Sequence, residues 1–192
     1  MYHHIKGQVV EASPTHAVIE TGGVGYLLNI SLQTYTFLNG KKEALLLTEL
    51  IVREDAQLIY GFYNRIEREM FKNLISVSGI GPNTGMLMLS SLSPNEIASA
   101  ISSEDVNTIK SIKGIGLKTA QRVIIDLKDK ISGVDLNLDN LNKTGNTTKN
   151  EALTALLSLG FNKNTAEKAL SKIKVNDGDS VEKIIKEALK IL

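Results

Sequence analysis

The sequence predicts a multi-domain α+β protein in which a small β-barrel comes first and helices fill the rest of the chain. Three observations lead to this fold class. Five short segments rich in Val, Ile, Leu and Tyr occupy residues 1–63. A Gly-Ile-Gly turn between helical patterns then occurs twice within residues 64–133, and a polar stretch separates these from a last helical segment, residues 151–192.

The amino-terminal residues 1–63 are expected to form five strands separated by turn residues. The expected strands are Ile5–Ala12, His16–Thr21, Val24–Ser31, Ala44–Val52 and Gln57–Phe62. Five short strands suit a closed barrel of the OB type, because closure leaves no exposed sheet edge. Many functions use this fold, so the barrel alone assigns none.

An acidic loop, Arg53–Ala56, separates the last two expected strands. One interpretation is a solvated hairpin tip, where charged side chains are common. The other is that Glu54 and Asp55 are held out as a pair of carboxylates. Beside a DNA-binding surface, such a pair would repel phosphates and would steer or part the strands.

Residues 64–133 contain the same pattern twice, a helix followed by a glycine turn and a second helix. The turns Gly79-Ile80-Gly81 and Gly114-Ile115-Gly116 lie 35 residues apart, and apolar positions align around them at the same offset. A fixed offset of this kind indicates an internal repeat. A helix capped by Asn64, with Glu67 three residues further on, is expected to lead into the first copy.

Each turn has the chemistry of a phosphate site. Glycine permits positive φ and close approach of a ligand, and a helix beginning at the turn offers unpaired N–H groups to an anion. Such contacts to nucleic-acid backbone do not read base sequence. The residues expected to bind DNA phosphate are Gly79, Gly81, Asn83 and Thr84 in the first copy and Gly114, Gly116, Lys118, Thr119 and Arg122 in the second. A single Gly-x-Gly turn is usually an ordinary turn, and it is the duplication that favours the phosphate interpretation.

The carboxyl-terminal part is expected to be a flexible linker, residues 134–150, followed by a three-helix bundle, residues 151–192. The linker is rich in Asn, Asp, Thr, Lys and Gly. In the bundle, Gly160 is expected to end the first helix, and Asn164 and Asp179 to cap the next two. A small bundle on a tether, with no catalytic residues, is most simply a docking module for another protein.

The composition excludes several classes of protein. The chain has no Cys, so disulfides and thiolate metal sites are excluded, and a reducing, cytoplasmic location is expected. No membrane-spanning run and no nucleotide-binding P-loop occur. The three His residues lie at positions 3, 4 and 16, and an adjacent pair on a regular strand would face opposite sides. No Ser/His/Asp arrangement is evident, and we expect no catalytic residue, metal or cofactor.

Four stretches together resemble one bacterial family, the Holliday junction branch-migration subunits. They are Gly23–Tyr26, the run from Arg53 through Ala56 to Phe62, both Gly-Ile-Gly turns with Lys118-Thr119-Ala120, and Leu156–Phe161. The resemblance covers essentially the full chain. The first repeat departs from the pattern because Asn83 stands where the second has Lys118.

The resemblance implies a homotetramer, single or paired face to face, that holds a four-way DNA junction open. The repeats would contact phosphates of the four arms, and Glu54 and Asp55 would form an acidic pin at the centre. The terminal bundle, through Leu156, Leu159, Gly160 and Phe161, would dock a hexameric AAA+ ATPase that drives branch migration. A junction resolvase would be a further partner.

Two other functions remain open from the residues themselves. Lys118 with a downstream Asp135 is similar to the turn of helix-hairpin-helix DNA glycosylases and lyases, in which the lysine attacks the sugar. Asp135 lies in a polar stretch, however, and base flipping needs a pocket that the chain does not suggest. The third possibility is a DNA-binding adaptor that works without a motor.

Overall fold

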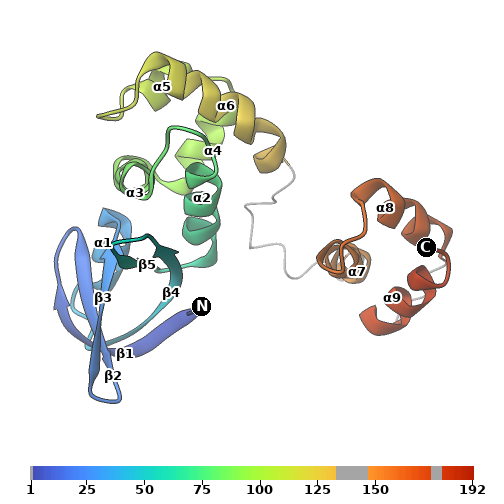
Figure 1. Ribbon diagram of the computed structural model, residues 1–192, viewed down its shortest axis with the longest axis horizontal. Coiled ribbons are helices and arrows are strands. Elements are labelled where there is room, and N and C mark those ends of the chain that lie inside the picture. Colours follow the sequence, from blue (N-terminus) through green and yellow to red (C-terminus); the bar gives the residue numbers. More distant parts are fainter. Residues whose placement is uncertain (1, 133–146, 174–178) are drawn as a thin grey trace. The chain divides into compact units, whose positions relative to one another are not determined.

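The computed structural model describes residues 2–132, 147–173 and 179–192. The chain divides into two compact units, residues 1–136 and 137–192. In the first unit, five strands lie beside a stack of helices (Figure 1). The expected linker, residues 134–150, lies outside the described residues as far as residue 146.

The five expected strands are confirmed, each to within one residue. They are β1 (His4–Ala12), β2 (His16–Thr21), β3 (Val24–Ile30), β4 (Glu43–Val52) and β5 (Gln57–Phe62). They close into a barrel of order β1-β2-β3-β5-β4, in which β3 and β5 are parallel and the other neighbours are antiparallel. Closure pairs β1 with β4, so neither strand remains an open edge. The predicted OB-type barrel is therefore confirmed.

One helix inside the barrel region was not predicted. Helix α1 (Leu32–Leu38) begins at Ser31, whose hydroxyl oxygen accepts a hydrogen bond from the backbone N–H of Thr34. Its fully buried Leu38 joins the barrel core, which also contains Ile19 and Leu28. The segment is too short to show a helical period, so only the capping serine could have indicated it.

The repeats form five helices, α2 (Arg65–Ile75), α3 (Pro82–Ser91), α4 (Pro94–Ser102), α5 (Val106–Lys110) and α6 (Leu117–Ser132). Helix α4 begins with a capping box formed by Ser93 and Glu96. Asp105 caps α5, and its side chain accepts hydrogen bonds from the backbone N–H groups of Asn107 and Thr108. One apolar core runs through this helical part from Met70 to Ile131.

Strand β5 belongs to two cores at once. Ile59 packs against the barrel core, and a Cβ on Gly61 would lie 2.9 Å from Leu28 Cδ2 in that core. Tyr60 and Phe62 alternate with them and lie in the helical core, where both rings are 5.0 Å from the Phe71 ring. The boundary expected at residue 63 is therefore not a break in packing. The barrel and the repeats form one unit.

The second unit contains α7 (Thr147–Ser158), α8 (Lys163–Lys172) and α9 (Val181–Leu189), as the predicted three-helix bundle requires. The first helix begins at Thr147, inside the segment expected to be linker. The caps also differ from the prediction, because Asn162 caps α8 and Ser180 caps α9. Ala152, Leu156, Leu170, Ile184 and Ala188 form much of its core.

Candidate nucleic-acid interface

The two Gly-Ile-Gly turns have the same backbone geometry. The first glycine of each adopts positive φ, +96° at Gly79 and +88° at Gly114, as expected for residues that reverse the chain. The central Ile80 and Ile115 are buried and anchor the turns in the helical core. Because each turn is fixed by its own buried isoleucine, the glycines lie on a rigid support.

The second glycine of each turn has a different role from the first. Gly81 has an ordinary φ of −84° and is the N-cap of α3, where no side chain caps the helix. Gly116 takes the matching position before α6, and a Cβ on either residue would meet open space. By contrast, side chains cap α1, α2, α4 and α5. The helices after the turns thus begin with uncapped N–H groups, which suit an anion.

The two turns lie next to each other within the first unit. A Cβ built on Gly79 would be 3.9 Å from Thr119 Cγ2, so the first turn lies against the start of the helix that follows the second. Thr84 and Thr119 are half-buried at equivalent positions of their helices. The repeat therefore brings two uncapped helix N-termini into one region of the surface.

The charged side chains of the second turn are exposed. Lys118 is exposed at the second position of α6. Arg122, one turn further along, lies 3.9 Å from Asp126 across an exposed pair of the kind that contributes little to stability. Both cations are therefore accessible to an anion at the helix start.

Asn83, which replaces the lysine in the first turn, has a partner that the sequence did not predict. Its Oδ1 accepts a hydrogen bond of 3.2 Å from the hydroxyl of Tyr60 on β5. Tyr60 is far from Asn83 in the sequence and belongs to the barrel, so no local pattern could have found the contact. The alternation of Tyr60 and Phe62 with Ile59 and Gly61 was the available signal that β5 has two buried faces.

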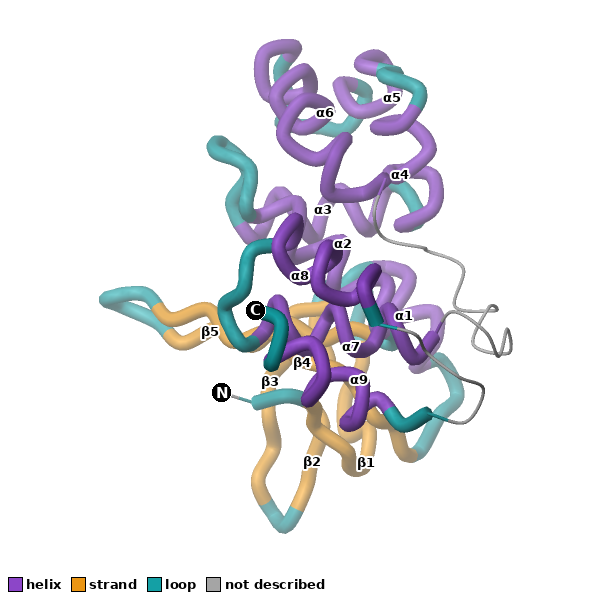
Figure 2. The backbone as a smooth tube through the Cα atoms, turned by 90° about the vertical axis from the view of Figure 1, so that its right-hand side faces the viewer, coloured by secondary structure: helices purple, strands orange, loops and turns teal. Residues whose placement is uncertain are grey.

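The acidic loop closes tightly between β4 and β5. The backbone N–H of Arg53 donates to the carbonyl of Ala56 at 2.8 Å, and Glu54 and Asp55 are exposed between them. Figure 2 shows the β4–β5 ribbon running outward to this loop. Neither carboxylate has a hydrogen bond or ion pair within the part of the chain described, so both charges are available to act at a distance.

The histidines differ from the expectation. His3 precedes β1 rather than lying in it, and its Nδ1 is 3.1 Å from Nδ1 of His4, with the two rings nearly perpendicular at 87°. The described residues nevertheless contain no group of three His, Cys, Asp or Glu side chains that could hold a metal.

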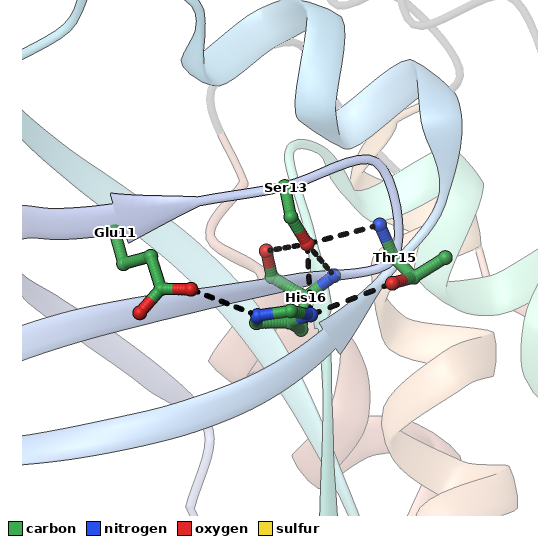
Figure 3. A network of polar contacts seen from close by, with 4 residues as sticks. All are labelled: Glu11, Ser13, Thr15 and His16. Atoms are coloured by element: carbon green, nitrogen blue, oxygen red, sulfur yellow. Dashed lines mark hydrogen bonds and ion pairs between the residues drawn. The ribbon is translucent and has the colours of Figure 1, made fainter.

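A Ser/His/acid chain does occur, contrary to the expectation. His16 Nε2 lies 3.0 Å from Glu11 Oε1 and its Nδ1 lies 2.8 Å from Ser13 Oγ (Figure 3). The Ser13 oxygen also accepts from the backbone N–H of His16 and donates to its carbonyl. This serine is committed to closing the β1–β2 turn, and the network holds that turn rather than activating a nucleophile.

Three of the four residues expected to dock a motor have structural roles in the second unit. Gly160 has a φ of +94°, and the N–H groups of Gly160 and Phe161 donate to the carbonyls of Leu157 and Leu156. These two bonds make the glycine cap that ends α7, and Phe161 and the fully buried Leu156 both belong to the core. Leu159 is the one large apolar side chain of the four that is well exposed, at 61%.

The alternative of a glycosylase or lyase gains no support from the geometry. Lys118 is exposed at the start of α6. The residue that would assist it, Asp135, lies outside the described residues.

None of the helices described is long and apolar enough to cross a bilayer.

Together, the closed barrel, the duplicated turns and the uncapped helix starts define a tandem helix-hairpin-helix protein of the nucleic-acid-binding class. Family models match along the chain: RuvA N terminal domain over residues 1–61, SAM-like helix-hairpin-helix tandem over 71–129, and RuvA C-terminal domain over 148–192. The chain belongs to the RuvA family.

Relatives match over their whole length. The chain is 51% identical to a protein of Christiangramia forsetii, 53% identical to one of Flavobacterium psychrophilum and 46% identical to one of Bacteroides thetaiotaomicron, with 100% of both chains covered in each case. All three relatives are named Holliday junction branch migration complex subunit RuvA.

Proposed function

We propose that this chain binds four-way DNA junctions through its two hairpin turns and serves as the non-catalytic DNA-binding subunit of a branch-migration complex. The observation that carries the proposal is the pair of helix N-termini, of α3 and α6, that follow the glycine turns and have no side chain at the N-cap position. Backbone N–H groups bind phosphate oxygens without reading bases, which suits a protein that must follow a moving junction.

Both backbone and side-chain groups of the hairpins would contact DNA phosphates. Gly79, Gly81, Gly114 and Gly116 give phosphates access to the turns, while Asn83, Thr84, Lys118, Thr119 and Arg122 add hydrogen bonds and charge. The region from residue 63 to residue 133 holds 9 basic and 7 acidic side chains, a small excess. Backbone donors therefore supply much of the proposed affinity.

The acidic pin gives the proposed selectivity for a junction. An open junction has a gap where the strands part, and Glu54 and Asp55 from each subunit fit there without meeting phosphate. Continuous duplex has no such gap, so its phosphates would be pressed toward the carboxylates. A homotetramer, single or paired, would place one subunit on each arm, since fourfold symmetry matches a four-armed substrate.

The second unit is the proposed docking module for a hexameric AAA+ ATPase, which would hydrolyse nucleotide and move the arms. Exposed Leu157 and Leu159 at the end of α7 provide an apolar contact.

A junction resolvase is a further proposed partner, and the cytoplasm, where the chromosome lies, is the proposed location. An adaptor that works without a motor would leave this surface unused, and a pull-down with full-length protein distinguishes the two.

The function is tested by a salt-titrated gel shift that compares a four-way junction with linear duplex of the same arm sequence. We expect tighter binding to the junction at every salt concentration. Lys118→Ala should lower the slope of log affinity against log salt by about one unit for each second hairpin bound, because one phosphate contact is lost there. Equal affinity for junction and duplex would contradict the proposal.

A further inference from the structure

The contact between Tyr60 and Asn83 joins the barrel to the first hairpin. The Tyr60 side chain is 1% exposed, and its ring packs against Phe71 with centroids 5.0 Å apart. Its hydroxyl reaches the start of α3 and donates to Asn83 Oδ1 at 3.2 Å. A rigid, buried aromatic side chain therefore meets an exposed amide beside an uncapped helix N-terminus.

In this hydrogen bond the oxygen side of the Asn83 amide faces the Tyr60 hydroxyl. A side-chain amide has one acceptor oxygen and one nitrogen with two donors, on opposite sides of the group. With Oδ1 accepting from Tyr60, the nitrogen is turned away from the Tyr60 hydroxyl. Asn83 is the second residue of α3, so these donors lie beside the backbone N–H groups that Gly81 leaves uncapped.

Tyr60 is suited to act as a permanent donor. Burial raises the pKa of its hydroxyl, and the nearby positive charge of Arg53 lowers it by less. The hydroxyl therefore keeps its proton throughout the neutral range and can donate a hydrogen bond to Oδ1 of Asn83.

We propose that Tyr60 is a positioning residue for DNA binding: it orients the amide of Asn83 so that Nδ2 donates to a backbone phosphate at the first hairpin. The second hairpin has Lys118 at the equivalent position, which needs no such orientation because an ammonium group donates in three directions. This inference rests on the proposed function of the hairpins as phosphate-binding sites.

The test measures junction affinity of full-length protein by fluorescence anisotropy in a double-mutant cycle of Tyr60→Phe and Asn83→Ala. Each single variant should weaken binding roughly threefold to tenfold, the range of one hydrogen bond. The double variant should bind no more weakly than Asn83→Ala, because the hydroxyl acts only through the amide. In an Asn83→Lys background, Tyr60→Phe should have no effect on affinity.

Controls separate orientation of the amide from packing of the barrel. Tyr35→Phe removes the hydroxyl of another partly buried tyrosine, which makes no side-chain hydrogen bond within the described residues, and should leave affinity unchanged. If Tyr60→Phe weakens binding as much in the Asn83→Ala or Asn83→Lys background as in the parent, the inference is overturned.

The proposed function has its own control. Should Gly116→Val abolish binding while Tyr60→Phe and Asn83→Ala change nothing, the positioning role fails and the phosphate-binding role of the hairpins stands. Should none of the three variants change affinity, both fail.

Discussion

The hydroxyl of Thr34 donates a 2.6 Å hydrogen bond to the carboxylate of Glu67, which joins α1 of the barrel to α2 of the helical repeats. Ser31 donates to the other carboxylate oxygen, and the backbone N–H of Tyr63 donates at 3.3 Å. Asn64 caps α2 as expected, but the Glu67 side chain does not return to Asn64 to complete a capping box. A fully buried carboxylate instead connects the two parts of the unit.

The first prediction concerns the pH dependence of stability. Burial raises the pKa of Glu67, and its three hydrogen bonds only partly offset this. A folded-state pKa above the unfolded value means that the contribution is fully present below the unfolded pKa and is lost as pH rises through the folded pKa. The free energy of unfolding of the first unit should therefore fall across that interval, by at most about 1.4 kcal/mol per pH unit for one proton.

Urea denaturation at a series of pH values measures this dependence. Glu67→Gln should flatten the slope, because the amide does not titrate. Glu69→Gln, at a neighbouring surface position, is the control and should leave it unchanged. Parallel curves for the parent and Glu67→Gln would show that Glu67 does not carry the pH dependence.

The second prediction uses the difference between the two glycines of a turn. Gly116 is not among the residues with positive φ, and a Cβ there would meet open space, so Gly116→Val should fold normally. Its branched side chain would occupy the proposed phosphate site. Each amide–phosphate bond lost costs about 1.5–3 kcal/mol, so junction and duplex should both bind at least tenfold more weakly.

Gly114→Val is the contrasting variant. Its φ of +88° would strain a branched residue, so this substitution should lower Tm as well as affinity. Gel shifts and thermal melts of the two variants check the distinction. A Gly116→Val protein that melts like the parent and binds normally would remove the second hairpin from the interface.

The third prediction concerns the acidic pin. Each carboxylate several Å from a DNA phosphate should cost roughly 1–2 kcal/mol at an intermediate dielectric. Neutralising both, as Glu54→Gln with Asp55→Asn, should raise affinity for linear duplex more than for the junction, most clearly at low salt. Competition binding with the two DNAs gives the ratio.

A matched control keeps net charge equal. Glu20→Gln with Glu43→Gln removes two exposed carboxylates elsewhere on the barrel and should raise both affinities alike. If the two double variants change the junction-to-duplex ratio equally, the acidic loop is only a solvated hairpin tip.

The fourth prediction concerns the surface of the second unit. Leu159→Ser should leave the fold and junction binding unchanged, because the side chain is exposed, yet reduce stimulation of the partner ATPase. Leu156→Ala, within the core, should instead destabilise the second unit by about 2–5 kcal/mol. Circular dichroism melts and ATPase assays with the partner motor separate the two. Full stimulation with Leu159→Ser would place docking elsewhere.

Local patterns predicted the strands and the repeated turns well, because both depend on residues that are close together in the sequence: alternating apolar residues in the strands and glycines in the turns. Helix caps were less predictable where several capping residues lie close together. Asn162 caps α8 two residues before the expected Asn164, and Ser180 caps α9 in place of Asp179, which pairs with Lys183. Any of these side chains could cap a helix, and the packing of the helix that follows decides which one does.

Contacts between residues far apart in the chain could not be predicted from local sequence patterns. Asn83 is a substitution in the repeat pattern, and only the fold shows that Tyr60 meets it. The same holds for Glu67, which the capping pattern assigned to Asn64 and the structure pairs with Ser31 and Thr34. Leu156 and Phe161 were expected to contact a motor, and the structure shows that both pack into the core of the bundle.

The two buried faces of β5 determine where the chain can be cut. A fragment ending at residue 63 would keep every strand of the barrel and still leave Tyr60 and Phe62 without the helices that cover them. Such a fragment would expose an aromatic strip and would be prone to self-association. An experimenter who wants the barrel must therefore clone it together with the repeats, and in heating experiments the two should melt in a single cooperative step.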